Sequence, residues 1–138
     1  MSRRRARITQ EQLKERTKRF ALDVFALGGT VPRTRVAEII AGQMVRSGTS
    51  TGANYRAACR ARSRADFDAK IGVAEEEADE SQYWLKLLLE TTLAKSVTVR
   101  RLIAEATELV AILSASRKTA REAEKERRRM VETRKVDD

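Results

Sequence analysis

Apolar residues recur at steps of three, four and seven in four separate segments of the chain, and this spacing constrains the fold more than any other feature. Residues at those steps lie on one side of an α-helix. The chain has a single proline, Pro32, and it is rich in Ala, Leu, Glu, Arg and Lys, which favour helices. The sequence therefore predicts an all-α protein, and no strand pattern competes with it.

The first predicted helix begins after Thr9, which forms a capping-box pattern with Gln12, and runs to about Leu27. We expect the Gly28-Gly29 pair to end it, because glycine accepts the left-handed conformation found at many helix C-termini. The apolar stripe of this helix consists of Leu13, Phe20, Val24 and Leu27.

The second predicted helix begins near Thr34. Its apolar face is expected to consist of Val36, Ile39, Ile40, Met44, Tyr55 and Cys59. The small and β-branched residues of segment 47–53 lower its helix propensity. Because the stripe resumes at Tyr55, we predict one helix through this segment. Its small side chains, including the Gly48-x-x-x-Gly52 pair, would let another helix approach closely.

Two further helices complete the pattern. The third begins at Ser63, with Asp66 in the capping position, and ends near Thr92. Its predicted buried side consists of Phe67, Ile71, Ala74, Ala78, Trp84, Leu85 and Leu88. The fourth carries Val99, Leu102, Ile103, Ala106, Leu109, Val110 and Leu113.

Four amphipathic helices with short links predict an antiparallel up-down-up-down four-helix bundle over residues 9–116. Residues 1–8 are arginine-rich and lack periodicity, so we expect a disordered basic arm. Residues 117–138 are mostly charged and bury no face, so we expect a charged helical extension or tail.

The net charge of +9 is unevenly distributed along the chain. Residues 1–19 carry a surplus of six positive charges, and residues 117–138 a surplus of three. In between, segment 33–64 has a surplus of six positive charges and segment 66–92 a surplus of six negative charges. Opposite charges on consecutive segments favour pairing between neighbouring helices or subunits, which leaves the two basic ends for an outside polyanion.

Three groups of arginines are candidate contacts to RNA or DNA, since the guanidinium fork matches phosphate oxygens. They are Arg3, Arg4, Arg5 and Arg7 in the arm, Arg46, Arg56, Arg60 and Arg64 along the second helix, and Arg127, Arg128 and Arg129 in the extension. The second-helix group has an alternative interpretation, pairing with the acids of the third helix, which the charge balance favours. The terminal groups have too few local acids for neutralisation, and they form either non-specific nucleic-acid contacts or solubilising tails. Aromatic residues do not alternate with them, so base stacking is not expected.

No catalytic centre, cofactor site or metal site is predicted. The sequence has no histidine and one cysteine, Cys59, which excludes the commonest general base and thiolate metal clusters. The acidic residues of segment 75–80 are interpreted as a salt-bridging face rather than a pair of catalytic carboxylates. Glu77, Glu80 and Trp84 are expected at an inter-helix contact or an interface. Ser50 and Asn54, one turn apart, are expected in an inter-helix hydrogen-bond network.

The sequence gives no sign of export or membrane insertion. The basic start is not followed by the apolar stretch of a secretory signal, and no apolar run is long enough to span a bilayer. We therefore expect a cytoplasmic protein without a membrane partner.

Several stretches taken together resemble the four-helix-bundle proteins of the 23S rRNA intervening-sequence family. They are RSGTSTGANYRAA at 46–58, SRADF at 63–67 with Lys70, EADESQYWL at 77–85 with Leu87 and Leu88, EATEL at 105–109 and SAS at 114–116. The resemblance covers roughly residues 15–120. It departs at Ala57-Ala58, where the family usually has Glu-Ala, so any ion pair or site that this glutamate serves would be missing here.

The resemblance implies an antiparallel bundle that often assembles as a homopentamer. It also implies a fold similar to the accessory protein of diversity-generating retroelements, a basic pentamer that works with a reverse transcriptase and RNA. The expected function is that of a non-enzymatic, oligomeric, nucleic-acid-binding accessory factor, with a reverse transcriptase as a candidate protein partner. The alternative is a structural or adaptor protein that forms a homo-oligomer and binds another protein.

Overall fold

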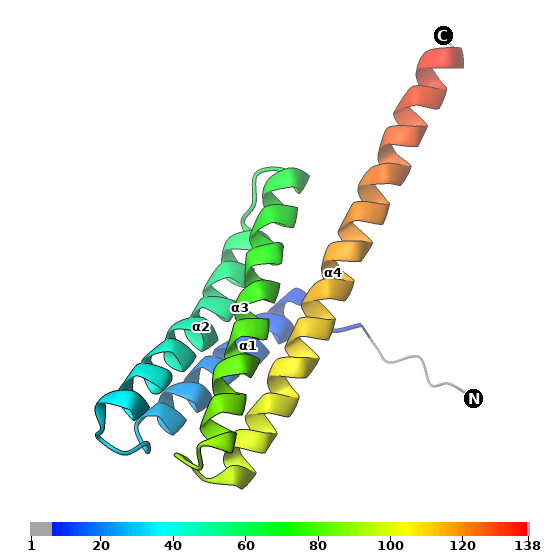
Figure 1. Cartoon of the computed structure of the whole chain (residues 1–138). Coiled ribbons are helices and arrows are strands. Elements are labelled where there is room, and N and C mark those ends of the chain that lie inside the picture. Colours follow the sequence, from blue (N-terminus) through cyan, green and yellow to red (C-terminus); the bar gives the residue numbers. More distant parts are fainter. Residues whose placement is uncertain (1–6, 138) are drawn as a thin grey trace, which may run out of the picture.

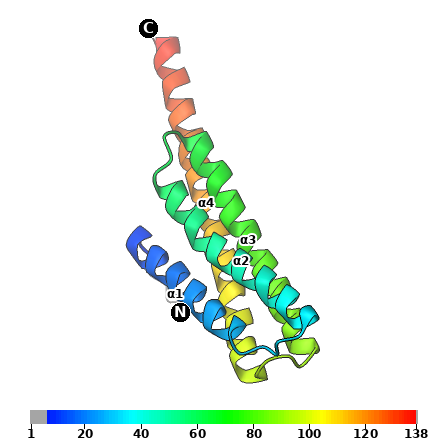
Figure 2. The same ribbon diagram turned by 90° about the vertical axis from the view of Figure 1, so that its left-hand side faces the viewer.

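The computed structural model describes residues 7–137, and four helices account for most of them. These are α1 (Gln10–Gly28), α2 (Arg35–Cys59), α3 (Arg64–Glu90) and α4 (Ser96–Asp137). Consecutive helices are joined by short links and pack side by side, and α4 continues well past the end of the bundle (Figures 1 and 2). The predicted all-α bundle is confirmed. No helix in this part of the chain is both long enough and apolar enough to span a membrane.

Hydrogen bonds and ion pairs join neighbouring helices, and two ion pairs show that α1 and α4 run antiparallel. The Ser81 hydroxyl of α3 donates to the Ser47 hydroxyl of α2 over 3.0 Å. On the other side of α3, the Gln82 amide donates to Thr107 of α4. Between α1 and α4, Arg16 pairs with Glu105, whereas the later residue Asp23 pairs with the earlier residue Arg101, as antiparallel helices require.

Side-chain caps begin three of the helices where the sequence predicts. Thr9 and Gln12 form a reciprocal capping box at α1. The Ser63 hydroxyl accepts a hydrogen bond from the Asp66 amide at α3, and Thr34 accepts one from the Ala37 amide at α2. Each cap satisfies a backbone donor that the first helical turn would otherwise leave without a partner.

The end of α1 differs from the prediction, because Gly29 has right-handed geometry with φ −70°. No glycine among residues 7–137 has a positive φ, and the left-handed position in this part of the chain is Thr92, with φ 54°, just after α3. Gly28 instead serves close packing: a Cβ at this position would lie 3.0 Å from the side chain of Val45 in α2. The glycine pair thus lets α1 and α2 come together at their link.

Segment 47–53 is helical and forms the contact between α2 and α1, as predicted. A Cβ on Gly48 would clash with the Val24 side chain, and one on Gly52 would lie 3.1 Å from the Thr17 hydroxyl oxygen. The buried hydroxyls beside this contact donate to carbonyls of their own helices, Thr17 to Leu13 and Thr51 to Ser47. Glycine and small polar residues therefore replace large side chains where α1 lies on α2.

The core consists mainly of aliphatic residues from all four helices. Its largest fully buried members include Leu13, Phe20, Val24, Met44, Ile71, Leu85, Leu88, Val99, Leu102, Leu109 and Leu113. The prediction for the start of α2 is wrong in part, since Val36 is 65% exposed and Ile39 is 56% exposed. Ala37, Ile40, Ala41 and Met44 form the inward face there, and helical rotation turns Val36 and Ile39 away from it. Phe67 and Trp84 are half-buried at the edge of the core.

Two glycine substitutions in α2 test the close contact with α1. Gly48→Ala should lower the free energy of unfolding by about 1–3 kcal/mol, because the new methyl group overpacks the contact with Val24. Gly42→Ala is the matched control, since a Cβ at this position would meet nothing within 4 Å. It should raise the free energy of unfolding by about 0.5–1 kcal/mol through helix propensity. Urea denaturation measures both, and equal effects would contradict the proposed packing.

Candidate nucleic-acid interface

The boundary between α2 and α3 contains one arginine that is fully engaged by acids. Arg46 of α2 pairs with Glu77 over 3.2 Å and also with Glu80, both in α3. The Trp84 indole N–H donates to the same Glu80 carboxylate over 3.2 Å. The Arg46 contact lowers the pKa of Glu80, whereas burial raises the pKa of Glu77. The predicted pairing of α2 arginines with α3 acids is thus confirmed for Arg46, which is held and not available as a free phosphate ligand.

The other arginines of this predicted group do not pair with α3 acids within the described chain, and pairing with an adjacent chain stays a prediction for them. Arg56 and Arg60 are exposed and make no ion pair with any residue in 7–137. Arg64 begins α3 and pairs with Glu124 of α4 over 3.1 Å. The four arginines therefore have three different environments. Arg46 is paired with α3, Arg56 and Arg60 are exposed to solvent, and Arg64 is paired with α4.

Ser50 and Asn54 do not form an inter-helix network within the described chain. The Asn54 amide donates to the Ser50 carbonyl over 2.8 Å, a bond inside α2. The inter-helix hydrogen bond in this region belongs to Ser47 and Ser81, one turn earlier. Both of these serines are fully buried, and the spacing of polar residues along α2 did not distinguish Ser47 from its neighbours.

A clamp on Asp68 of α3 holds the first turns of the α4 extension. Arg117 donates to the Asp68 carboxylate over 3.1 Å, and Arg121 makes two hydrogen bonds to it over 2.9 and 3.0 Å. The Arg117 guanidinium lies across Gly72, where a Cβ would be only 3.2 Å from it. Hydrogen bonds from Arg121 and Arg117 lower the pKa of Asp68. Sequence reasoning missed Asp68 and Gly72, because only the alignment of α3 with α4 brings them to the arginines.

Beyond the clamp, the predicted arginine cluster of the extension is only partly neutralised. Arg127 and Arg128 both pair with Glu124, which also holds Arg64, and Arg129 approaches Glu126 at 4.0 Å. These arginines do have acidic neighbours, but one carboxylate, that of Glu124, serves three arginines. Residues 117–138 keep a surplus of three positive charges.

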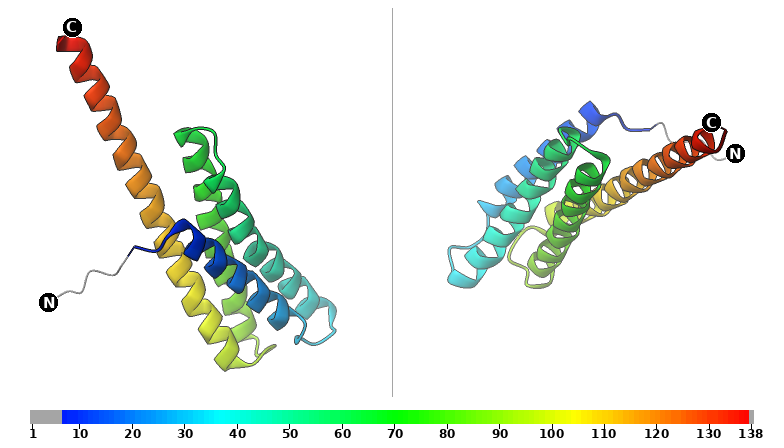
Figure 3. Two further views of the ribbon diagram at one scale, coloured as in Figure 1. Left: turned by 180° about the vertical axis from the view of Figure 1, so that it is seen from behind. Right: turned by 90° about the horizontal axis from the view of Figure 1, so that it is seen from above.

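Basic residues of the extension recur on the side of α4 that faces α3. The steps of four, seven and seven between Arg117, Arg121, Arg128 and Lys135 place them along one helical stripe. The first two contact Asp68, and the end of α4 projects alone past the beginning of α3 (Figure 3). The same stripe also contains Glu124, which pairs with Arg128, so outside the bundle it carries a mixture of basic and acidic side chains.

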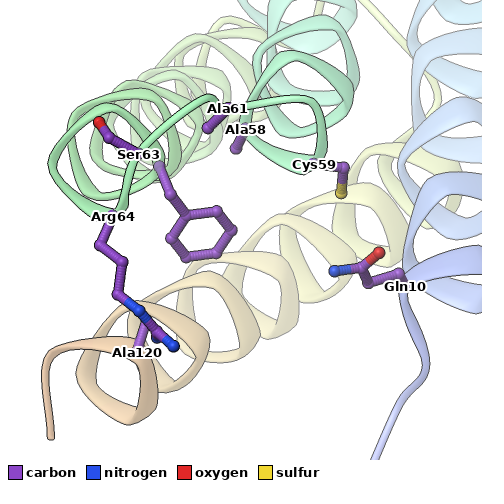
Figure 4. A pocket seen from close by; sticks show the side chains of 8 residues that line it. Gln10, Ala58, Cys59, Ala61, Ser63, Arg64 and Ala120 are labelled. Carbon is purple, nitrogen blue, oxygen red and sulfur yellow. The ribbon is translucent and has the colours of Figure 1, made fainter. Parts of the chain in front are cut away.

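Arg7 lies at a groove between the start of α1 and α4. This groove has a volume of about 740 Å³, and Arg16 and Arg64 also line it. An adjoining hollow of about 280 Å³ shares Gln10, Arg64 and Ala120 with it (Figure 4). Arg3, Arg4 and Arg5 lie outside the described residues. Between residues 7 and 137, no three His, Cys, Asp or Glu side chains gather closely enough to hold a metal ion.

Comparison with known proteins places the chain in a family. The model of the 23S rRNA-intervening sequence protein family matches residues 9–115. The chain belongs to this family. Curated proteins yield no match. A crystal structure of a protein of unknown function from Bacteroides thetaiotaomicron, described as a member of the S23 ribosomal protein family, is similar at 32% identity with a TM-score of 0.74. The match covers 80% of this chain and 99% of that one. The family match ends at residue 115, so the basic extension of α4 lies outside it.

The Asp68 clamp should be visible in hydrogen exchange of the extension. Asp68→Asn should speed amide exchange in residues 117–124 at neutral pH, because the asparagine no longer attracts Arg117 and Arg121 as a carboxylate does. The folded pKa of Asp68 is lowered, so the clamp is fully formed above the ordinary carboxyl pKa and is lost as pH falls through the folded pKa. Wild type and variant should therefore converge in acid.

Asp79→Asn is the control for this measurement, since Asp79 is exposed in the same helix and pairs with no residue in the described part of the chain. It should exchange like wild type in residues 117–124. Equal exchange in wild type and Asp68→Asn at neutral pH would show that the clamp does not hold the extension.

Proposed function

We propose that this protein is a non-enzymatic, homo-oligomeric nucleic-acid-binding accessory factor that contacts the phosphate backbone of RNA or DNA. The observation that carries the proposal is the α4 extension, which projects from the bundle and in which nine basic residues outnumber six acidic ones. Such a surface binds polyanions by releasing their counterions, without reading sequence. The arm residues Arg3, Arg4, Arg5 and Arg7 add to the charge at the other terminus.

RNA is the favoured partner because of the family's name, which links it to 23S rRNA, and because of the ribosomal family named for the similar crystal structure. That link is one of association rather than geometry. A role beside a reverse transcriptase, implied by the resemblance to retroelement accessory proteins, stays a prediction.

A four-residue variant of the extension tests the proposal. It replaces with glutamine the basic residues Arg128, Arg129, Arg134 and Lys135. The affinity for short labelled single-stranded RNA and DNA of mixed sequence should fall, and the dependence of log Kd on log salt should become shallower by about one unit for each phosphate that the variant no longer neutralises. Fluorescence anisotropy between about 50 and 200 mM salt measures both quantities.

A matched control removes four exposed basic residues at the opposite end of the bundle: Arg33, Arg35, Lys86 and Lys95. Its net charge equals that of the test variant. A difference in affinity between the two variants therefore reports a local contact of the extension with the nucleic acid and not the effect of total charge on binding. It should bind more tightly than the test variant. Absence of binding by wild type at low salt would refute the proposed function, and equal reductions in affinity for both variants would refute the role of the extension.

The second candidate function is that of a structural or adaptor protein, and an exposed apolar face on α1 favours self-association. Leu22 and Phe25, three positions apart on one side of α1, are exposed. Phe25 is 66% exposed and borders a groove of about 470 Å³ that Val31 also lines. Exposed apolar patches of this kind mark protein interfaces. We infer that a second copy of the chain covers this face, and the family resemblance implies a homopentamer.

Phe25→Glu tests this face, because a charge on it disfavours burial against another copy. Multi-angle light scattering should give an oligomer for wild type and a smaller mass for the variant. Val97→Glu is the control, since Val97 is 80% exposed at the start of α4, and its mass should equal that of wild type. A monomeric wild-type protein, or an unchanged mass for Phe25→Glu, would contradict the assignment.

A further inference from the structure

A hollow between the outer sides of α2 and α3 is surrounded by basic side chains. It has a volume of about 460 Å³ and is lined by Ala53, Arg56, Ala57, Arg60 and Lys70. The two alanines, four positions apart on α2, are too short to fill the space between the longer side chains. The result is a recess with a floor of methyl groups and three cationic side chains at its edge.

The charges around this hollow are not balanced. Arg56 and Arg60 pair with no acid in residues 7–137, and Lys70 is bound to Asp66 over 2.9 Å. Arg62 also lies close enough to Asp66 to lower the pKa of that carboxyl, after the larger effect of Lys70. Asp66 is therefore an acid close to the hollow, but its charge is already shared by Lys70 and Arg62.

The helix-to-helix alignment explains why the hollow stays cationic. Residues three or four positions apart on α3 lie along its boundary with α2. They are Asp66, Lys70, Val73, Glu77, Glu80 and Trp84. Glu77 and Glu80 lie opposite Arg46 and neutralise it. Farther along the same boundary, Lys70 lies at the hollow beside Ala57, and Val73 is the next residue. The boundary therefore changes from acidic, with two glutamates beside Arg46, to basic at Arg56.

The spacing of the two free arginines suits a chain of phosphates. Residues four apart on a helix share a side and differ by about 6 Å along its axis. In the absence of an anion, like charges at this spacing repel each other. A phosphodiester lying over the hollow would relieve this repulsion and accept hydrogen bonds from both guanidinium groups.

We propose that the hollow formed by Arg56, Arg60 and Lys70 is a binding site for the phosphodiester backbone of a nucleic-acid strand, separate from the α4 extension. The inference rests on the proposed function, for which it names a second contact on the body of the bundle. Neither α2 nor α3 contributes an aromatic ring to the lining, so the site recognises phosphate and not the bases.

The test compares two full-length variants with the same net charge. Arg56→Gln with Arg60→Gln empties the site of its two free arginines. The matched control is Arg33→Gln with Arg35→Gln, at the opposite end of the same helix pair, where both arginines are exposed and without an ion pair in the described chain. Circular dichroism should show the same helix content for both, since none of the four side chains is buried.

The readout is the affinity for a short labelled single-stranded RNA of mixed sequence and for its DNA equivalent. The site variant should bind about tenfold more weakly than wild type at low salt. The slope of a plot of log Kd against log salt concentration should be shallower by about two units. The affinity of the control should fall by less than about threefold under the same conditions. A third variant, Arg56→Lys with Arg60→Lys, should regain most of the salt slope, because it restores the charge without the fork.

The possible outcomes separate this inference from the proposed function. If wild type binds and the site and control variants are equally affected, the phosphate site is refuted while the proposed function stands. If wild type binds neither RNA nor DNA at low salt, both are refuted. If the site variant binds more weakly than its control, and the extension variant also binds more weakly than its own control, two separate contacts are established.

Discussion

The close approach of α1 to α2 is the constraint on which the rest of the structure depends. Gly48 and Gly52 leave no space for a Cβ against Val24 and Thr17. On the α3 side, the buried hydroxyls of Ser47 and Ser81 bond to each other. Small residues occupy the inward face of α2 from Ser47 to Gly52, and its arginines lie on the exposed sides of the helix.

The positions of carboxylates on the neighbouring helix then determine which basic side chains form ion pairs. Arg46 has Glu77 and Glu80 opposite it, and Arg117 with Arg121 has Asp68. Such pairs contribute little to stability when exposed, so their main effect is to fix the side chains in position. Where basic side chains outnumber the acids near them, as at the hollow on α2 and along the end of α4, positive charge remains available for a polyanion.

The sequence predicted the features that depend on local interactions. The starts of α1 and α3 follow from Thr9 and Ser63, whose caps involve residues three positions away. It failed at Val36 and Ile39, because their spacing is helical whether or not they face the core. It also missed Asp68 as the partner of Arg117, which is 49 positions away. That contact depends on the alignment of α3 with α4, and local patterns do not fix it.

α4 carries its basic residues past the bundle as one continuous helix. Pulsed electron paramagnetic resonance tests it directly, with spin labels at Ser114 and Glu132 in a Cys59→Ala background. Both labelled positions are exposed, and a helix between them spans about 27 Å along its axis. A continuous helix predicts a narrow distribution of distances near this value. A broad distribution centred well below it would show that the extension is not a continuous helix.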